Sequence, residues 1–170
     1  MNKEEYFLEK YLKPCTKVSA KFPLEIGDDS AIISSPEDLL ISSDNSVIDV
    51  HFPSLLDAYY IAYRAVAIAA SDIIAMGSYP EGYLLNITHP DPTDQWFEKF
   101  TSGIKDFNDD YGTNLIGGDL TKGELNISVT VFGKQLDKII KRSGAKVDDD
   151  IYIISIFLFI HHEVVERDVK

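Results

Sequence analysis

The sequence has only one cysteine, Cys15, among its 170 residues. A single thiol forms no internal disulfide and supplies no cysteine-based zinc site, so both kinds of cross-link are excluded. Basic residues are also few, because 16 Lys and Arg stand against 28 Asp and Glu, for a formal net charge of −12. An acidic surface repels nucleic-acid phosphates and anionic membranes, so we expect neither as a partner.

Long apolar runs and targeting signals are missing as well. The first five residues are polar, and the longest apolar stretch, near the C-terminus, is broken by Ser155. That stretch is far shorter than the ~20 residues that span a bilayer, so we expect a soluble, cytoplasmic protein. The sequence also lacks a P-loop, a protein-kinase glycine-rich loop and a His-Glu-x-x-His zinc helix. Any phosphate chemistry therefore needs another kind of site.

The length predicts one ordinary domain in which strands and helices alternate. We expect strands at residues 31–34, 39–43, 82–88, 114–116 and 125–132, a short helix at 4–12, and long helices at 54–76 and 93–111. Two long helices suffice to cover one face of the sheet, which predicts an α+β fold.

Two local patterns make this expectation more specific. Ser54, followed by Asp57 three residues later, is typical of a capping box at the start of the first long helix. The uninterrupted apolar run at residues 39–41 predicts a strand that is buried on both faces.

Four acidic sites stand at the ends or edges of the expected elements: residues 27–29, residues 42–44, Asp72 and residues 117–119. Asp72 shares helical spacing with a stripe of small apolar residues, where an uncompensated carboxylate is costly to bury. The glycines before Asp119 let the backbone approach a phosphate where a strand passes into a loop. Each site alone could be an ordinary turn or a solvated strand end. Together, without a matching basic cluster, they favour several Mg²⁺ ions held by carboxylates.

The histidines are less informative. His51 follows the second acidic site and precedes a helix, where a surface histidine and a substrate contact are equally good interpretations. His161 and His162 are adjacent, so on a strand they would point to opposite faces, and we do not expect them to share a metal.

Taken in chain order, these motifs resemble the thiamine-monophosphate kinase family, within the group that includes aminoimidazole-ribonucleotide synthetase and selenophosphate synthetase. The matching stretches are residues 26–31, 41–44, 51–52, 69–77, 115–119, 141–145 and 149–152. Each motif is modest, but their order and spacing are specific, and the resemblance extends over about residues 20 to 153.

The resemblance implies a fold like the N-terminal domain of aminoimidazole-ribonucleotide synthetase: a mixed or antiparallel sheet, covered on one face by two long helices, that pairs with a second copy as a homodimer. It implies ATP-dependent phosphorylation of thiamine monophosphate to thiamine diphosphate, with no residue assigned as a general base. The implied Mg²⁺ ligands are Asp29, Ser42, Ser43, Asp44, Asp72 and Asp119; the ATP contacts are Gly118, Asp119 and Arg142; and His51 lies against the substrate phosphate.

The chain departs from the family pattern at three places. Asp49 stands where the family usually has Gly, and Leu120 where Thr is common. After Ile153 the pattern of the family's second domain is lost, so we expect an ATP- and Mg²⁺-binding domain at residues 1–150 and a divergent tail at 151–170, as from a truncated or frameshifted gene. Two alternatives stay open: a non-catalytic remnant that dimerises and binds Mg-nucleotide, and another enzyme of the same group.

Overall fold

The computed structural model describes residues 3–23, 26, 33–34, 39–134, 140–141, 143 and 146–150. In chain order these form α1 (Lys3–Phe7), the π-helical turn η1 (Leu8–Leu12), the 3₁₀ turn η2 (Lys13–Cys15), β1 (Leu39–Val47), α2 (Ala58–Ala75), β2 (Pro80–His89), α3 (Asp94–Tyr111), β3 (Leu115–Lys122) and β4 (Asn126–Lys134). Asp29, Arg142 and the tail at residues 151–170 lie outside the described residues, as does half of the strand expected at 31–34. Residues 33 and 34 are described and are not in a strand.

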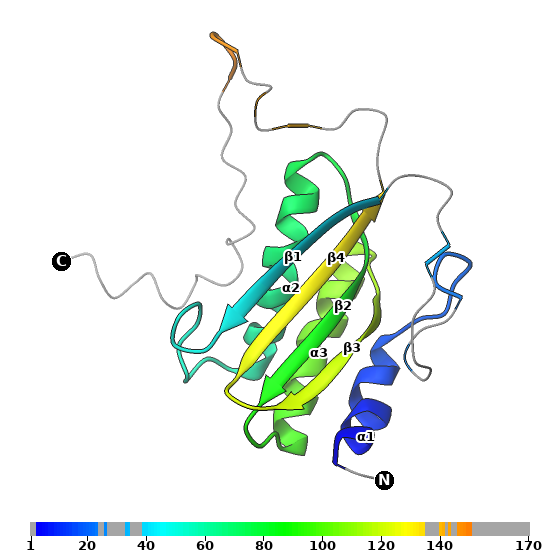
Figure 1. Cartoon of the computed structure of the whole chain (residues 1–170), viewed down its shortest axis with the longest axis vertical. Coiled ribbons are helices and arrows are strands. Elements are labelled where there is room, and N and C mark those ends of the chain that lie inside the picture. The colour runs from blue at the N-terminus through cyan, green and yellow to red at the C-terminus, as the bar shows by residue number, and fades with distance from the viewer. Residues whose placement is uncertain are drawn as a thin grey trace, which may run out of the picture.

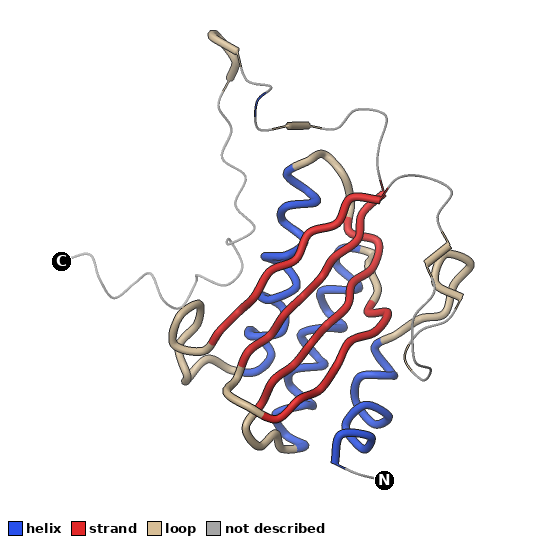
Figure 2. Tube along the Cα trace, in the orientation of Figure 1, coloured by secondary structure: helices blue, strands red, loops and turns tan. Residues whose placement is uncertain are grey.

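The four strands form one sheet in the order β1-β4-β2-β3 (Figures 1 and 2). The β1–β4 and β4–β2 pairs are antiparallel, whereas β2 and β3 are parallel and are joined through α3, the helical crossover that a parallel pair requires. Both long helices, α2 and α3, lie behind the sheet in Figure 1. The expected α+β fold, with a mixed sheet covered on one face by two helices, is confirmed.

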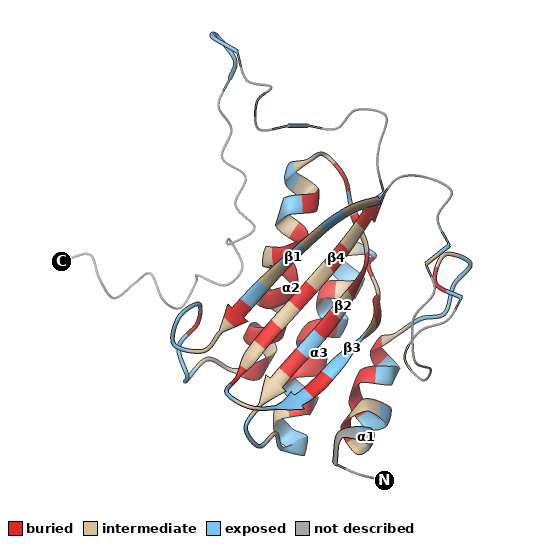
Figure 3. Ribbon diagram, in the orientation of Figure 1, coloured by how far each residue is buried: buried red, intermediate tan, exposed pale blue. Residues whose placement is uncertain are grey.

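The core lies between the sheet and these helices. Along β4, Ile127, Val129 and Val131 are fully buried and alternate with partly exposed polar residues, as the banding of the ribbon in Figure 3 shows. From α3 a stripe of buried side chains faces them: Phe97, Phe100, Ile104 and Phe107. Helix α2 is apolar and long enough to cross a membrane by length and composition alone, but half of it is buried against the rest of the fold, as in the core helix of a globular domain.

The expectation that the first strand is buried on both faces is wrong. Among the described strands, β1 is an edge strand that pairs with β4 alone, and Ile41 is 61% exposed. Ile41 pairs with Phe132, the neighbour of the buried Val131, so it lies on the face of the sheet on which, in the described part of the chain, no helix packs.

The expected capping box is also wrong. Residues 53–56 form a turn in which the Leu56 N–H donates to the Pro53 carbonyl at 3.0 Å. Asp57 is the N-cap of α2, because its carboxylate accepts from the Tyr59 N–H at 3.1 Å, and Lys99 of α3 pairs with the same carboxylate. The predicted start of the second long helix is confirmed: Thr93 is the N-cap of α3.

The strand-to-loop transition expected at residues 117–119 does not exist, since these residues lie within β3. Gly118 has φ of 150°, and a Cβ at this position would lie 1.8 Å from the Leu85 carbonyl oxygen of the neighbouring β2. The glycine is therefore required for the close approach of two strands.

Candidate metal and nucleotide site

The groove between β1 and α2 gathers three of the predicted site residues. Ser42 and Asp44 pair across the sheet with Val131 and Val129, whose side chains face the helices, so both also lie on the helix side. The Ser42 Oγ donates to the Asp72 Oδ2 at 2.7 Å, which joins the middle of β1 to the last turns of α2. We call this set of residues, Ser42, Asp44 and Asp72, the β1–α2 groove.

The carboxylates of the groove are partly solvated. Asp72 is exposed and lies next to edge strand β1, so its carboxylate is not buried among the small apolar residues of its stripe. Asp44 is half-buried, and its Oδ1 accepts from the Asn45 N–H at 2.7 Å. Each carboxylate thus has one local donor and retains further lone pairs for another ligand.

A pocket of about 480 Å³ opens beside Ser42 and Asp72. Its lining is mainly apolar, with Ser42, Asp72 and Lys141 as polar members; the complete set is Leu40, Ile41, Ser42, Asp72, Ile73, Ala75, Met76, Ile140 and Lys141. An apolar wall with a few convergent polar groups is the usual composition of a small-molecule site.

The other predicted residues on the strands lie on the opposite face. The Ser43 Oγ is 3.0 Å from the Thr130 Oγ1 on the open face of the sheet. Asp119 lies on that face too, where its carboxylate accepts from the Thr121 hydroxyl at 2.9 Å. It is on β3, the opposite edge from β1, and three strand spacings of ~4.8 Å put roughly 14 Å between the two edges.

The three described acids, Asp44, Asp72 and Asp119, therefore do not meet in one cluster. In the ranges that the structure covers, no group of three or more His, Cys, Asp or Glu side chains is close enough to hold a metal ion. Asp119 instead belongs to a polar row that crosses all four strands in register, formed by Asn45, Ser128, Asn86 and Asp119. This row was not predicted from the sequence, although the alternation of polar residues along β4 is a signal of the strand face to which it belongs.

His51 lies at the other end of β1. Its Nδ1 accepts from the Val47 N–H at 3.1 Å, and a bridge between Ile48 and the buried Phe52 closes the loop around it. Because Nδ1 accepts, the neutral ring carries its proton on Nε2. Asp49, in the same loop, has φ of 58°, a left-handed conformation that explains why a glycine suits this position.

The groove fits Mg²⁺ better than a metal that needs a complete cage of protein ligands. Mg²⁺ prefers oxygen donors and usually binds through one or two carboxylates, retained waters and substrate phosphates. Asp44 and Asp72 provide such carboxylates, and the Ser42 hydroxyl is in contact with one of them.

This fold and its acidic groove define a domain of a known class. The chain matches the family of AIR synthase related proteins, N-terminal domain, over residues 27–135, and it belongs to that family. Curated relatives within it include thiamine-monophosphate kinases, as the sequence predicted. The enzyme of Haemophilus influenzae is 36% identical over 151 residues, which cover 87% of this chain and 46% of the relative.

Solved structures agree. The thiamine-monophosphate kinase of Stenotrophomonas maltophilia K279a superposes with a TM-score of 0.69 at 33% identity, covering 77% of this chain and 42% of that one. AaThiL complexed with AMPPCP and TMP gives a TM-score of 0.62 at 30% identity, covering 71% and 40%. The chain thus spans less than half the length of the relatives it matches.

Proposed function

We propose that this chain forms the Mg²⁺- and nucleotide-binding part of an ATP-dependent kinase that converts thiamine monophosphate to thiamine diphosphate. The observation that carries the proposal is the Ser42–Asp72 contact beside the 480 Å³ pocket, on the same face as Asp44. The likeness to AaThiL complexed with AMPPCP and TMP supports an ATP-like ligand and this substrate class.

Phosphoryl transfer depends on in-line positioning and on neutralised charge more than on covalent help from the protein. Bound Mg²⁺ would supply that neutralisation between the phosphates and an acidic chain. Asp44 and Asp72 are the residues that would hold it, and the Ser42 hydroxyl fixes the orientation of the Asp72 carboxylate. No general base is assigned, because the acceptor oxygen of a phosphate is already ionised at neutral pH.

His51 is the proposed contact to the substrate phosphate. Its Nδ1 is used by the loop, so Nε2–H is the donor that can reach a ligand. Asp49 brings a carboxylate into this loop, but its Oδ1 accepts from the Ser54 N–H at 3.0 Å and is thereby committed to the loop itself.

We further propose that two copies associate in the cytoplasm through the open face of the sheet. This face carries Ile41, which is 61% exposed, together with Ser43 and the polar row that includes Asp119. An Ile41→Asp variant is expected to sediment as a monomer where the parent sediments as a dimer, because it places a charge in the interface. The control is Leu55→Asp, at a 96% exposed position in the loop before α2. Equal sedimentation of all three proteins as one species would contradict this interface.

The function is tested by incubating the purified chain with Mg-ATP and thiamine monophosphate and measuring thiamine diphosphate by chromatography. The Asp72→Asn variant retains an acceptor for Ser42 but loses the charge, so product formation is expected to fall at least tenfold, as for Asp44→Asn. The control, Asp109→Asn, removes a charge from an exposed site on α3 and is expected to leave the rate unchanged.

Other outcomes separate the alternatives. Calorimetric binding of Mg-ATP without product formation indicates a domain that only binds nucleotide. Turnover of a different phosphate or carboxylate acceptor in a substrate panel indicates another enzyme of the group. Unchanged product formation by Asp44→Asn and Asp72→Asn contradicts the groove as the metal site.

A further inference from the structure

Arg64 lies on α2, the helix that forms one side of the β1–α2 groove. It precedes Asp72 by eight residues, and at 3.6 residues per turn the two side chains are about 80° apart around the helix axis. Asp44 on β1 is the charged group whose field acts on the Arg64 guanidinium. Arg64 therefore borders the same groove as the proposed metal ligands, nearer to the N-terminal end of α2.

One end of this guanidinium has no acceptor among the described residues. The Arg64 Nη1 is buried and has no hydrogen-bond partner in the described structure. The described ion pairs do not include one between Arg64 and Asp44. Burial lowers the pKa of Arg64, and the charge of Asp44 opposes that effect. Since arginine stays protonated in proteins, the donor cannot be removed by loss of a proton.

A buried, charged donor without an acceptor costs free energy, and native structures rarely retain one without a reason. The acceptor that Arg64 lacks must fit into a groove whose own carboxylates have other partners: Asp44 accepts from the Asn45 N–H and Asp72 from Ser42. An anionic ligand satisfies this requirement, because its oxygens supply the missing acceptor and its charge complements the guanidinium.

We propose that Arg64 is an anion-binding residue of the β1–α2 groove, whose Nη1–H donates to a phosphate oxygen of a polyphosphate held there. The ligand class rests on the proposed function, whereas the anion contact itself rests on the unpaired buried donor. Eight helical residues separate Arg64 from Asp72 by about 12 Å along the axis of α2. That span leaves room for a polyphosphate chain between the metal-binding carboxylates and Arg64, and the planar guanidinium matches phosphate geometry.

The test compares the whole chain with Arg64→Met, which retains the length of the side chain, and with Arg64→Lys, which retains its charge. Lys105→Met, which removes one exposed positive charge from α3, is the matched control. Calorimetry with Mg-pyrophosphate probes the anion contact, Mg-ATP probes the nucleotide, and Mg²⁺ alone probes the carboxylates. Urea unfolding without ligand shows that each variant is folded.

Loss of a charge-assisted hydrogen bond predicts roughly 10- to 100-fold weaker binding of Mg-pyrophosphate to Arg64→Met. Arg64→Lys is expected to recover part of the loss, and Lys105→Met to bind like the parent. Binding of Mg²⁺ alone should be equal or tighter in Arg64→Met, because a positive charge near Asp44 has been removed. A purely structural role would weaken both ligands together.

Equal pyrophosphate affinity of the parent and a folded Arg64→Met overturns the proposal while leaving the kinase function standing. Pyrophosphate binding that depends on Arg64, without nucleotide binding or product, supports the anion site and contradicts the kinase function. Absence of pyrophosphate binding to the parent overturns the anion site directly.

Discussion

Among the described glycines, Gly118 is the one at which an added Cβ would come closest to a neighbouring atom. Replacement by alanine adds one methyl group, and this Cβ would lie 1.8 Å from the Leu85 carbonyl oxygen and 2.6 Å from its carbon. These are backbone atoms of β2, so no side-chain rotation relieves the overlap. The parallel β2–β3 pair, which carries Asn86 and Asp119, must separate or shift.

The expected cost has two parts. The φ of 150° is a conformation that non-glycine residues adopt only at roughly 1–3 kcal/mol. Displacing a packed neighbour adds about 1–3 kcal/mol, as for other overpacked sites. The sum, roughly 2–6 kcal/mol, is a large share of the 5–15 kcal/mol that holds a typical domain together.

Urea unfolding followed by circular dichroism measures this loss for Gly118→Ala. The control is Gly112→Ala at the C-cap of α3, which has φ of 63° but where a Cβ meets nothing within 4 Å. That variant carries only the cost of the left-handed conformation, about 1–2 kcal/mol. If Gly118→Ala loses no more stability than Gly112→Ala, the argument that close strand approach requires this glycine is refuted.

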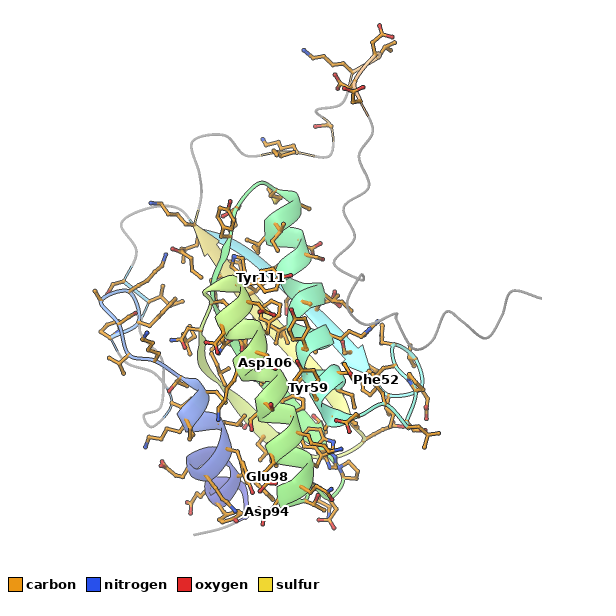
Figure 4. All side chains as sticks on the ribbon, turned by 180° about the vertical axis from the view of Figure 1, so that it is seen from behind. Phe52, Tyr59, Asp94, Glu98, Asp106 and Tyr111 are labelled. Carbon is orange, nitrogen blue, oxygen red and sulfur yellow. The ribbon has the colours of Figure 1, made fainter. Side chains whose placement is uncertain are left out.

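Two further predictions concern the loop after β1 and the helix interface. Asp49→Ala is expected to destabilise the fold by about 2 kcal/mol, because alanine at φ of 58° is strained and the Ser54 N–H loses its acceptor. Asp49→Gly should cost about 1 kcal/mol less, and the reverse order in urea unfolding would contradict the assigned conformation. Burial, with the hydrogen bond that the Tyr59 hydroxyl donates to Asp106 (side chains labelled in Figure 4), raises the pKa of Tyr59 to about 12. The stabilisation that comes with this raised pKa is fully present below the unfolded pKa of about 10 and is lost as the pH rises to about 12. Urea midpoints between pH 9 and 12 should therefore fall less steeply for Tyr59→Phe than for the parent. Tyr79→Phe, at a 74% exposed position, is expected to leave the slope unchanged, and an equal slope for Tyr59→Phe would argue against the role of this hydroxyl.

Periodicity predicted the elements well where packing follows one face. The stripe of α3 and the alternation of β4 each describe one buried side, and both elements were placed correctly. The failures have a common cause, since they depend on partners that the local sequence does not contain. An apolar run is equally compatible with a central strand and with an edge strand such as β1. The two glycines before Asp119 are typical of a loop, and only the structure shows that Gly118 is there because β2 approaches closely.

For the site, the residue types were predictable but their common location was not. Ser42, Ser43 and Asp44 are consecutive on one strand, so alternation alone sends Ser43 to the opposite face from the other two. The location of Asp119 was not predictable either, because the order of the strands in the sheet, rather than spacing along the chain, sets its distance from β1. No sequence pattern indicates a role for Arg64, because its significance lies in an acceptor that is missing among the described residues.

The distribution of the acids also determines how the fold depends on metal. A cluster of buried carboxylates would repel one another so strongly that the domain could not fold without cations. Here Asp72 is exposed, Asp44 is half-buried with a backbone donor, and Asp119 lies on the other face with its own hydroxyl partner. The chain is therefore expected to remain folded in a chelator, with circular dichroism unchanged. Mg²⁺ at ten times its dissociation constant should add only the ~1.4 kcal/mol that mass action supplies to a preformed site. Unfolding in the chelator would mean that the acids lie much closer together than this arrangement has them.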